Sequence, residues 1–308
     1  MNQTVLLVED DLADSKLIRR AFDKAEVAAR LVRARDGDDA VAYLDGTGPY
    51  TDRDEHPSPT LVLLDIKLPR RSGFEVLSWI RRDMRPLRRT PVVMLTSSRH
   101  AVDINRAYEL GANAYTVKPD TQADMIRLLG AIQSFWIQSS EPPLVASAGG
   151  GAGNAPVART HQVTPRRVLL IEDDPADAAL ITRAFDRAQF AGSIEHVLNA
   201  RAGLEWLRRR ISLDDPGEFP GLVLLDLKLP GMSGLEFLRE MRSMHELRQI
   251  PVVVLATAHD ADTINRAYEQ GANSYLVKTP DPDEVNRLIQ FVKQYWLSVN
   301  QGMASVTS

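Results

Sequence analysis

Five residues that could carry out chemistry each stand at the end of a short apolar run. They are two adjacent carboxylates, a third carboxylate, a hydroxyl and an ammonium group, namely Glu9, Asp10, Asp65, Thr96 and Lys118. Carboxylates packed together repel one another, and a hard divalent cation with oxygen ligands keeps them ionised. Such a cation and the lysine complement a transferring phosphoryl group, for which an aspartate is a known nucleophile. The pattern therefore predicts a magnesium-dependent phosphoacceptor with Asp65 as the nucleophile.

The apolar runs that precede these residues are predicted strands, at residues 5–8, 61–64, 92–95 and 114–117. Unbroken apolar runs favour strands that are buried on both faces of a sheet. After the first run, apolar residues recur at helical spacing from Leu17 to Ala25. This alternation predicts a parallel α/β sheet, in which ligands collect beyond the carboxyl ends of the strands. We therefore expect the five polar residues to converge on one edge.

The whole pattern occurs twice. The segment VLLVEDDLADSKLIRRAFDKAE from Val5 returns as VLLIEDDPADAALITRAFDRAQ from Val168, and LVLLDIKLPRRSG from Leu61 returns as LVLLDLKLPGMSG from Leu222. A chain of 308 residues is long enough for two domains. The sequence predicts a first domain at 1–138, a flexible linker rich in Ser, Ala, Gly and Pro at 139–165, a second domain at 166–300 and a tail at 301–308.

The second copy keeps the acidic residues, the lysine and a tyrosine before it, as Glu172, Asp173, Asp226, Tyr275 and Lys278. The second copy differs from the first at the position of the threonine hydroxyl. Thr96 lies 22 residues before Lys118, but the same spacing from Lys278 leads to Ala256, with Thr257 one place later. A shift of one residue along a strand points a side chain to the opposite face, although an irregular strand end would still bring the threonine round. We expect a second site that accepts a phosphoryl group but transmits the event poorly.

Composition excludes several other classes of protein. Hydrophobic residues make up 44% and charged residues 25%, as in ordinary globular proteins, and the net charge of −4 leaves neither half basic, which argues against nucleic-acid binding. The chain has no cysteine, which removes disulfides and thiolate chemistry and fits a reducing cytoplasm. No apolar run approaches the roughly 20 residues of a membrane span. We expect a soluble, cytoplasmic protein.

The residues around the predicted site resemble the response-regulator receiver family. The resemblance rests on Glu9–Asp10, on LLDIKLPRRSG around Asp65, on Thr96 and on the segment from Tyr115 to Pro119, and it extends over residues 3–136 and 166–296. It implies a doubly wound, five-stranded parallel sheet of the flavodoxin-like, CheY-like type in each half. The long loop before the third strand and the aromatic helix ends SFWI and QYWL more narrowly resemble single-domain receivers that partner phytochrome-type histidine kinases.

The resemblance also implies a role for each site residue. Asp65 and Asp226 would be the phosphoacceptors. The phosphoryl oxygens would be contacted by Thr96, Lys118 and Lys278. The aromatic residues that switch on activation would be Tyr115 and Tyr275. Magnesium would be held by Glu9, Asp10 and Asp65 with the backbone carbonyl of Lys67, and in the second copy by Glu172, Asp173 and Asp226 with that of Lys228. The phosphoryl donor would be a histidine kinase or a histidine phosphotransfer protein. The phosphorelay would then signal to a downstream protein by contact.

Other interpretations of these residues remain open. Asp11 and Asp14 are suited to capping a helix, and Tyr115 and Tyr275 to a hydrophobic core. As a whole, the chain could instead be a phosphate sink or a scaffold whose second receiver docks partners without switching. A hydrolase of the haloacid dehalogenase type would need an acid where Lys67 stands. We expect no enzyme beyond self-phosphorylation from small donors and self-dephosphorylation.

Two further expectations concern partners. Only residues 299–308 follow the second copy, which is too few for a DNA-binding or other output domain. Contacts of a homodimer are expected on residues 104–117 together with the helix end at Trp136.

Overall fold

The computed structural model describes residues 3–82, 89–140, 167–211 and 219–299. The chain divides into two compact units, the first built mainly on Met1–Gln138 and the second mainly on Asn154–Ser308, together with Ser139–Leu144. Most of the predicted linker, at 141–165, and the predicted tail at 301–308 lie outside the described residues. None of the helices in these ranges is long and apolar enough to cross a membrane.

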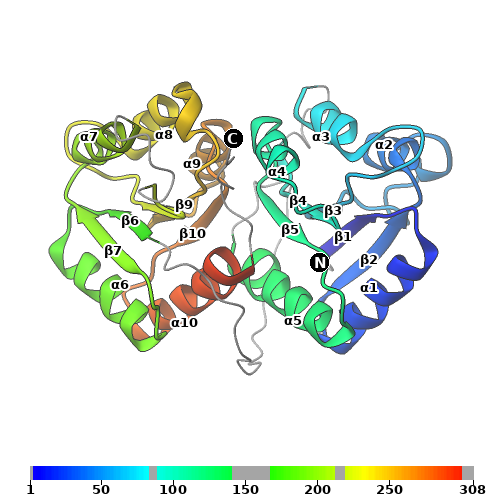
Figure 1. The fold of residues 1–308 in the computed structure, drawn as a ribbon, viewed down its shortest axis with the longest axis horizontal. Coiled ribbons are helices and arrows are strands. Elements are labelled where there is room, and N and C mark those ends of the chain that lie inside the picture. The colour runs from blue at the N-terminus through cyan, green and yellow to red at the C-terminus, as the bar shows by residue number, and fades with distance from the viewer. Residues whose placement is uncertain (1–2, 83–88, 141–166, 212–218, 300–308) are drawn as a thin grey trace. The chain divides into compact units, whose positions relative to one another are not determined.

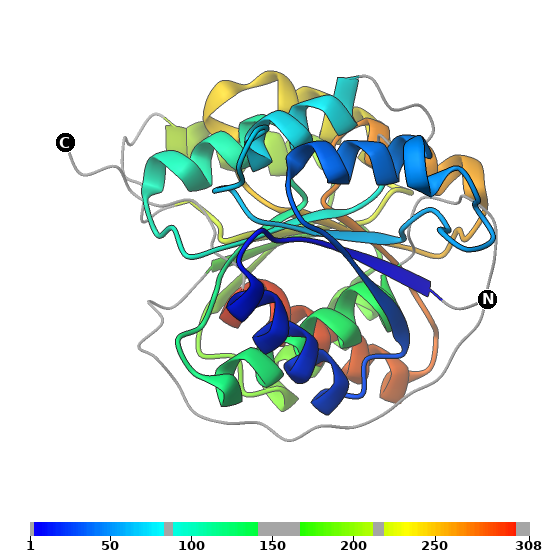
Figure 2. The ribbon, with the colours of Figure 1, turned by 90° about the vertical axis from the view of Figure 1, so that its right-hand side faces the viewer.

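The first unit is a five-stranded parallel sheet with helices on both faces. Its strands lie in the order β2-β1-β3-β4-β5. They are β1 Gln3–Val8, β2 Ala29–Ala34, β3 Leu61–Leu64, β4 Val92–Thr96 and β5 Ala114–Val117. The helices are α1 Leu12–Lys24, α2 Gly37–Asp45, η1 Gly48–Tyr50, α3 Gly73–Arg82, α4 Ala101–Glu109, α5 Gln122–Ile132 and η3 Gln133–Ser139. Helices α1 and α5 cover one face, and α2, α3 and α4 cover the other (Figures 1 and 2).

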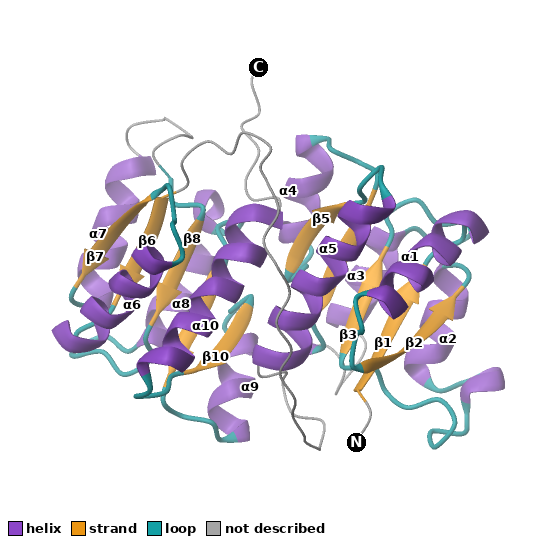
Figure 3. Ribbon diagram, turned by 90° about the horizontal axis from the view of Figure 1, so that it is seen from below, coloured by secondary structure: helices purple, strands orange, loops and turns teal. Residues whose placement is uncertain are grey.

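The second unit repeats this architecture. Its strand order is β10-β9-β8-β6-β7, again all parallel. The strands are β6 Arg167–Ile171, β7 Ser193–Val197, β8 Leu222–Leu225, β9 Val252–Ala256 and β10 Ser274–Val277. The helices are α6 Pro175–Arg187, α7 Ala200–Ile211, α8 Gly234–Ser243, η5 His245–Leu247, α9 Ala261–Glu269, α10 Pro282–Val292 and η6 Lys293–Val299. Seen from below, α6 and α10 lie in front of this sheet (Figure 3). The predicted doubly wound fold is confirmed in both halves.

Burial explains which strands the sequence reveals. Every residue of β3, β4, β8 and β9 is buried, as unbroken apolar runs require. At one edge of each sheet, β2 and β7 are only partly buried, and β7 includes the polar residues Glu195 and His196, whereas β5 and β10 at the opposite edges are mostly buried. Strands β2 and β7 lack the apolar runs that predict the other strands. The aromatic helix ends are core, since Phe135, Trp136, Tyr295 and Trp296 are at most 5% exposed.

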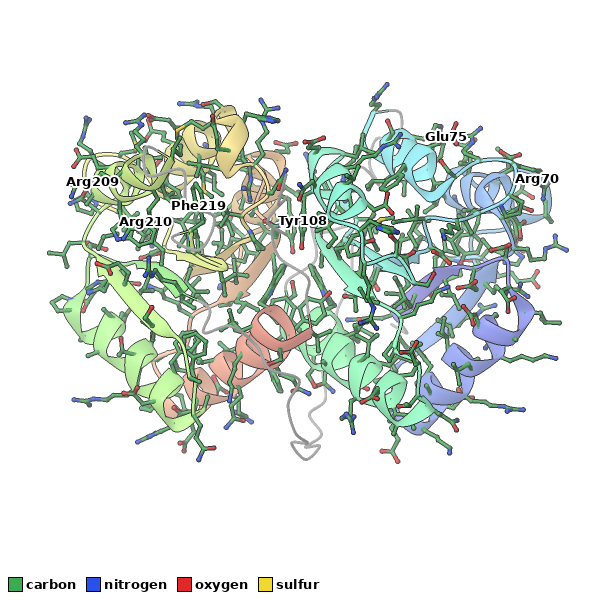
Figure 4. All side chains as sticks on the ribbon, viewed as in Figure 1. Arg70, Glu75, Tyr108, Arg209, Arg210 and Phe219 are labelled. Carbon is green, nitrogen blue, oxygen red and sulfur yellow. The ribbon has the colours of Figure 1, made fainter. Side chains whose placement is uncertain are left out.

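Local hydrogen bonds fix where the helices beside the site begin. The Ser233 side chain accepts from the amide of Glu236, whose carboxylate bonds back to Ser233, in a capping box at the start of α8. In the first unit the Glu75 carboxylate accepts from the amide and the hydroxyl of Ser72 at 2.8 and 2.7 Å, at the start of α3 (Figure 4). Both helices therefore begin at the same distance from the strand that precedes them.

Candidate functional site

The three acidic residues predicted for the first site come together at the carboxyl ends of β1 and β3. Val8 is paired with Leu64 in the parallel register, so the residues that follow them lie side by side. Glu9, Asp10 and Asp65 each offer a carboxylate oxygen, and these oxygens all lie within 4.8 Å of one another. Three hard oxygen donors at this spacing fit a divalent cation such as Mg²⁺.

Lys118 joins this acidic cluster from the end of β5. Its Nζ lies 2.6 Å from Glu9 Oε2, 2.6 Å from Asp65 Oδ2 and 3.0 Å from Asp14 Oδ2. Burial alone would lower the pKa of Lys118, but hydrogen bonds and charge from Asp65 and Glu9 outweigh it and raise the pKa above its ordinary value. The ammonium group therefore stays charged beside the acceptor carboxylate.

Glu9 is the most deeply buried of the three carboxylates, with 1% of its surface exposed. Loss of solvation raises its pKa from 4.5 to about 7, although the hydrogen bond and charge of Lys118 work in the opposite direction. Burial therefore favours the protonated form of Glu9 more than it would for an exposed glutamate. The backbone of Glu9 is also fixed, because Arg33 Nε, on the β2 strand, donates a hydrogen bond to its carbonyl oxygen at 3.0 Å.

Asp65 is fixed by hydrogen bonds to each of its oxygens. Its Oδ1 accepts from the amide of Ile66 at 2.6 Å and, more weakly, from the amide of Lys67 at 3.4 Å, while its Oδ2 accepts from Lys118. The Lys67 side chain itself is exposed. Asp65 is 6% exposed, so a small part of it is open to solvent. An aspartate oriented in this way is suited to act as a nucleophile toward a group that arrives at this edge.

Thr96 is the last residue of β4 and Tyr115 lies within β5, and both are buried, each with 0% of its surface exposed. Thr96 Oγ1 accepts from the amide of Ser98 at 3.4 Å, and the Tyr115 hydroxyl donates to the carbonyl oxygen of Ser98 at 3.0 Å. Burial raises the pKa of Tyr115 to about 12, so its hydroxyl remains a donor at neutral pH. Both side chains therefore form a hydrogen bond with the backbone of Ser98 in the β4–α4 loop.

The second site has the same acidic cluster with a different lysine geometry. Oxygens of Glu172, Asp173 and Asp226 lie within 4.8 Å of one another. Lys278 Nζ lies 2.5 Å from Glu172 Oε2 but 3.2 Å from Asp226 Oδ2, so it is closer to the buried glutamate than to the predicted acceptor. Burial raises the pKa of Glu172, as it does for Glu9. Asp226 Oδ1 accepts from the amides of Leu227 and Lys228 at 2.6 and 3.3 Å.

The structure places Ala256, and not Thr257, where the first unit has its threonine. Ala256 is paired with Val277 at the end of the sheet, as Thr96 is paired with Val117. Ala256 is buried and Thr257 is exposed, so the strand stays regular to its last residue. Tyr275 keeps the tyrosine position, and its hydroxyl donates to the carbonyl oxygen of Ala258 at 2.7 Å.

Two kinds of residue contribute to the sites in a way that the sequence did not predict, and Asp14 is one of them, because the sequence suggested it only as a helix cap. Asp14 and its counterpart Asp177 contact the site lysines, whereas the neighbouring Asp11 caps α1 by accepting from the amides of residues 13 and 14 at 2.7 and 2.8 Å. Gly73 and Gly234 pack so closely that an added Cβ would lie 1.9 and 2.3 Å from the acceptor's carbonyl oxygen. Their recurrence at matching places in both copies was the available signal.

Comparison with known proteins identifies the class. The family model described as response regulator receiver domain matches residues 5–130 and again residues 168–290. The chain therefore belongs to the response regulator receiver family, with two receiver domains in tandem.

Individual relatives are each similar to one receiver's length of the chain. The probable methanogenesis regulatory protein FilR2 of Methanothrix harundinacea is 42% identical over 139 residues, which cover 44% of this chain and 87% of that protein. Response regulator Rcp1 of Synechocystis is 37% identical over 141 residues, which cover 46% of this chain and 93% of that protein. Among solved structures, the Mn(2+)-bound form of Rcp1 matches with 37% identity and a TM-score of 0.42, over 46% of this chain and 99% of that one.

Proposed function

We propose that this protein is a phosphorelay response regulator in which Asp65, and also Asp226, accepts a phosphoryl group from a phosphohistidine. The observation that carries the proposal is the buried acceptor carboxylate of Asp65, held 2.6 Å from the ammonium group of Lys118 and clustered with Glu9 and Asp10. The same arrangement recurs in the second unit.

The transfer follows from the groups at the site. A carboxylate oxygen of Asp65 attacks phosphorus, the phosphorus–nitrogen bond of the phosphohistidine breaks, and the electron pair remains on the imidazole nitrogen of the donor. Lys118 moves from the carboxylate to the new phosphoryl oxygens, which carry more negative charge than the carboxylate did. The hydroxyl of Thr96 is the second group that we assign to these oxygens.

Mg²⁺ is the cofactor that we propose, because the donor set consists of carboxylate oxygens. Glu9, Asp10 and Asp65 would hold it together with the backbone carbonyl of Lys67, and Glu172, Asp173, Asp226 and Lys228 would do the same in the second unit. When bound, the cation neutralises charge on the transferring phosphoryl group. The protein supplies the oriented nucleophile and the lysine.

The proposed partner is a histidine kinase, of the phytochrome type, or a histidine phosphotransfer protein. The long loop before β3 and the aromatic helix ends, which resemble receivers that work with such kinases, support this choice. The phosphorylated protein would act in the cytoplasm by contact with a downstream protein. No turnover of an external substrate is proposed, only self-phosphorylation from small donors and self-dephosphorylation.

A second candidate function applies to the second receiver. Ala256 supplies no hydroxyl to a phosphoryl group, and Lys278 lies 0.6 Å farther from Asp226 than Lys118 lies from Asp65, as the distances of 3.2 and 2.6 Å show. This receiver would therefore serve as a phosphate sink or a docking scaffold that does not switch.

Intact-protein mass spectrometry tests these proposals. The full chain would be incubated with Mg²⁺ and acetyl phosphate, as wild type and as Asp65→Asn and Asp226→Asn variants. The exposed Asp23 of α1 gives a control variant, Asp23→Asn. Two added phosphoryl groups, each lost with its own variant, are expected. One addition lost only with Asp65→Asn would make the second receiver a docking domain, and none, even with a kinase supplied, would leave a scaffold.

A further inference from the structure

Ser98 joins the predicted switch residues of the first receiver to helix α4. Its amide donates to Thr96 Oγ1 and its carbonyl oxygen accepts from the Tyr115 hydroxyl. Its hydroxyl donates to Asp103 Oδ2 at 2.5 Å, across five residues of the chain. Ser98 is 5% exposed, so solvent competes little for these hydrogen bonds.

Asp103 belongs to the first turn of α4, which otherwise begins without a side-chain cap. The residue at the N-cap position, His100, makes no capping hydrogen bond with its side chain, and its amide donates to Ser98 Oγ at 3.3 Å. The start of α4 is therefore attached to the serine of the β4–α4 loop through both the helix side chain and the backbone. A displacement of Ser98 acts directly on this end of the helix.

The second receiver has neither partner of this hydrogen bond. Ala258 stands at the position of Ser98, and Thr263 stands at the position of Asp103. Helix α9 instead has an N-cap of its own, because Asp260 Oδ1 accepts from the amide of Thr263 at 2.9 Å. Its first turn is therefore satisfied locally, and the Tyr275 hydroxyl donates to the backbone carbonyl oxygen of Ala258 in the preceding loop.

We propose that Ser98 and Asp103 are positioning residues that transmit phosphorylation of Asp65 from Thr96 and Tyr115 to α4, and that the second receiver lacks this connection. The inference rests on the proposed phosphoacceptor function. When Thr96 turns toward the phosphoryl group, its hydroxyl leaves the amide of Ser98, and the loop that carries Ser98 shifts with the tyrosine. The Ser98–Asp103 hydrogen bond then pulls the first turn of α4, whereas α9 keeps its own cap and stays in place.

Hydrogen exchange of the full chain, with and without acetyl phosphate and Mg²⁺, measures this response. The readout is the ratio of exchange rates between the two conditions for peptides covering residues 101–109 and 261–269, with phosphorylation of Asp65 scored by mass spectrometry in the same samples. Ser98→Ala removes the hydroxyl, Ser98→Thr restores it, and Asp103→Ala removes the acceptor. Thr263→Ala is the matched control in the second receiver.

In the wild type we expect the ratio for residues 101–109 to change several-fold and the ratio for residues 261–269 to remain near one. Ser98→Ala and Asp103→Ala should bring the first ratio close to one while Asp65 is still phosphorylated, and Ser98→Thr should keep it. A merely structural bond would alter exchange equally in both conditions and leave the ratio unchanged.

Three results would overturn the proposal. The first is an exchange ratio for residues 101–109 in Ser98→Ala that equals the wild-type ratio. The second is a loss of this ratio in Ser98→Thr as large as the loss in Ser98→Ala. The third is a change in the ratio for α9 as large as the change for α4. Failure of the proposed function is seen separately, as an Asp65 that gains no phosphoryl group in the wild type, and the proposal would fall with it.

Discussion

Replacing Glu9 by glutamine should change how the stability of the first receiver depends on pH. Burial raises the pKa of Glu9 from 4.5 to about 7, so the folded protein holds a proton that the unfolded chain releases at lower pH. This shift corresponds to about 3 kcal/mol at most. The contribution is fully present below pH 4.5 and is lost as the pH rises through about 7. Without a divalent cation, the wild type should therefore lose up to about 3 kcal/mol between pH 5 and pH 8 that Glu9→Gln keeps.

The assay is urea unfolding followed by hydrogen exchange of peptides from β1, at several pH values, with and without Mg²⁺. Peptides from β6 report on the second receiver in the same samples. Because the cation binds the ionised carboxylate, Mg²⁺ should stabilise the wild type more at pH 8 than at pH 6 and should stabilise Glu9→Gln much less.

The control variant is Glu109→Gln, which removes an exposed carboxylate at the end of α4. It should reproduce the pH profile of the wild type. If Glu9→Gln and wild type lose stability in parallel between pH 5 and pH 8, burial of Glu9 has no such effect and the reasoning is wrong.

Three further substitutions, one of them with a control variant, test local contacts in the two receivers. Gly73→Ala would place a Cβ 1.9 Å from the carbonyl oxygen of Asp65. It should lower the free energy of unfolding by at least about 2 kcal/mol and abolish phosphorylation of Asp65, as seen by mass spectrometry. The control Gly130→Ala, in open space within α5, should instead raise the free energy of unfolding by about 0.5–1 kcal/mol. Ser233→Ala removes the capping box of α8 and should lower the free energy of unfolding of the second receiver by about 1 kcal/mol, as measured in urea; an unchanged midpoint would contradict it. Asn113→Ala removes the acceptor for a buried β4 amide at 2.9 Å and should cost about 2 kcal/mol in the same assay, with a loss below about 0.5 kcal/mol refuting that role.

Much of the fold could be predicted because it is written in local patterns. Unbroken apolar runs mark β1, β3, β4 and β5, and the repeat of the whole pattern marks two domains. The carboxyl ends of parallel strands lie along the same edge of a sheet. The types of the residues that follow these strands were therefore enough to predict a cluster of carboxylates with a lysine. The edge strand β2, partly buried and with polar residues between apolar ones, gave no such pattern.

The tertiary structure decided which of two neighbouring acidic residues contacts the site lysine and which caps a helix. Asp11 and Asp14 lie in the same turn and both suit a helix cap, yet in the folded chain Asp14 Oδ2 lies 3.0 Å from Lys118 Nζ, whereas Asp11 caps the helix. Ser98 and Asp103 likewise carry no signal in the sequence by themselves.

The sequence by itself determined the residue types at the strand ends and the exchange of Thr96 for Ala256, because strand parity and spacing are properties of the local chain. Tertiary structure decided the burial of Glu9, the two lysine geometries and the attachment of α4 to Ser98. These depend on which segments, distant in the chain, pack around a side chain, since desolvation and hydrogen-bond partners are set by all of them together.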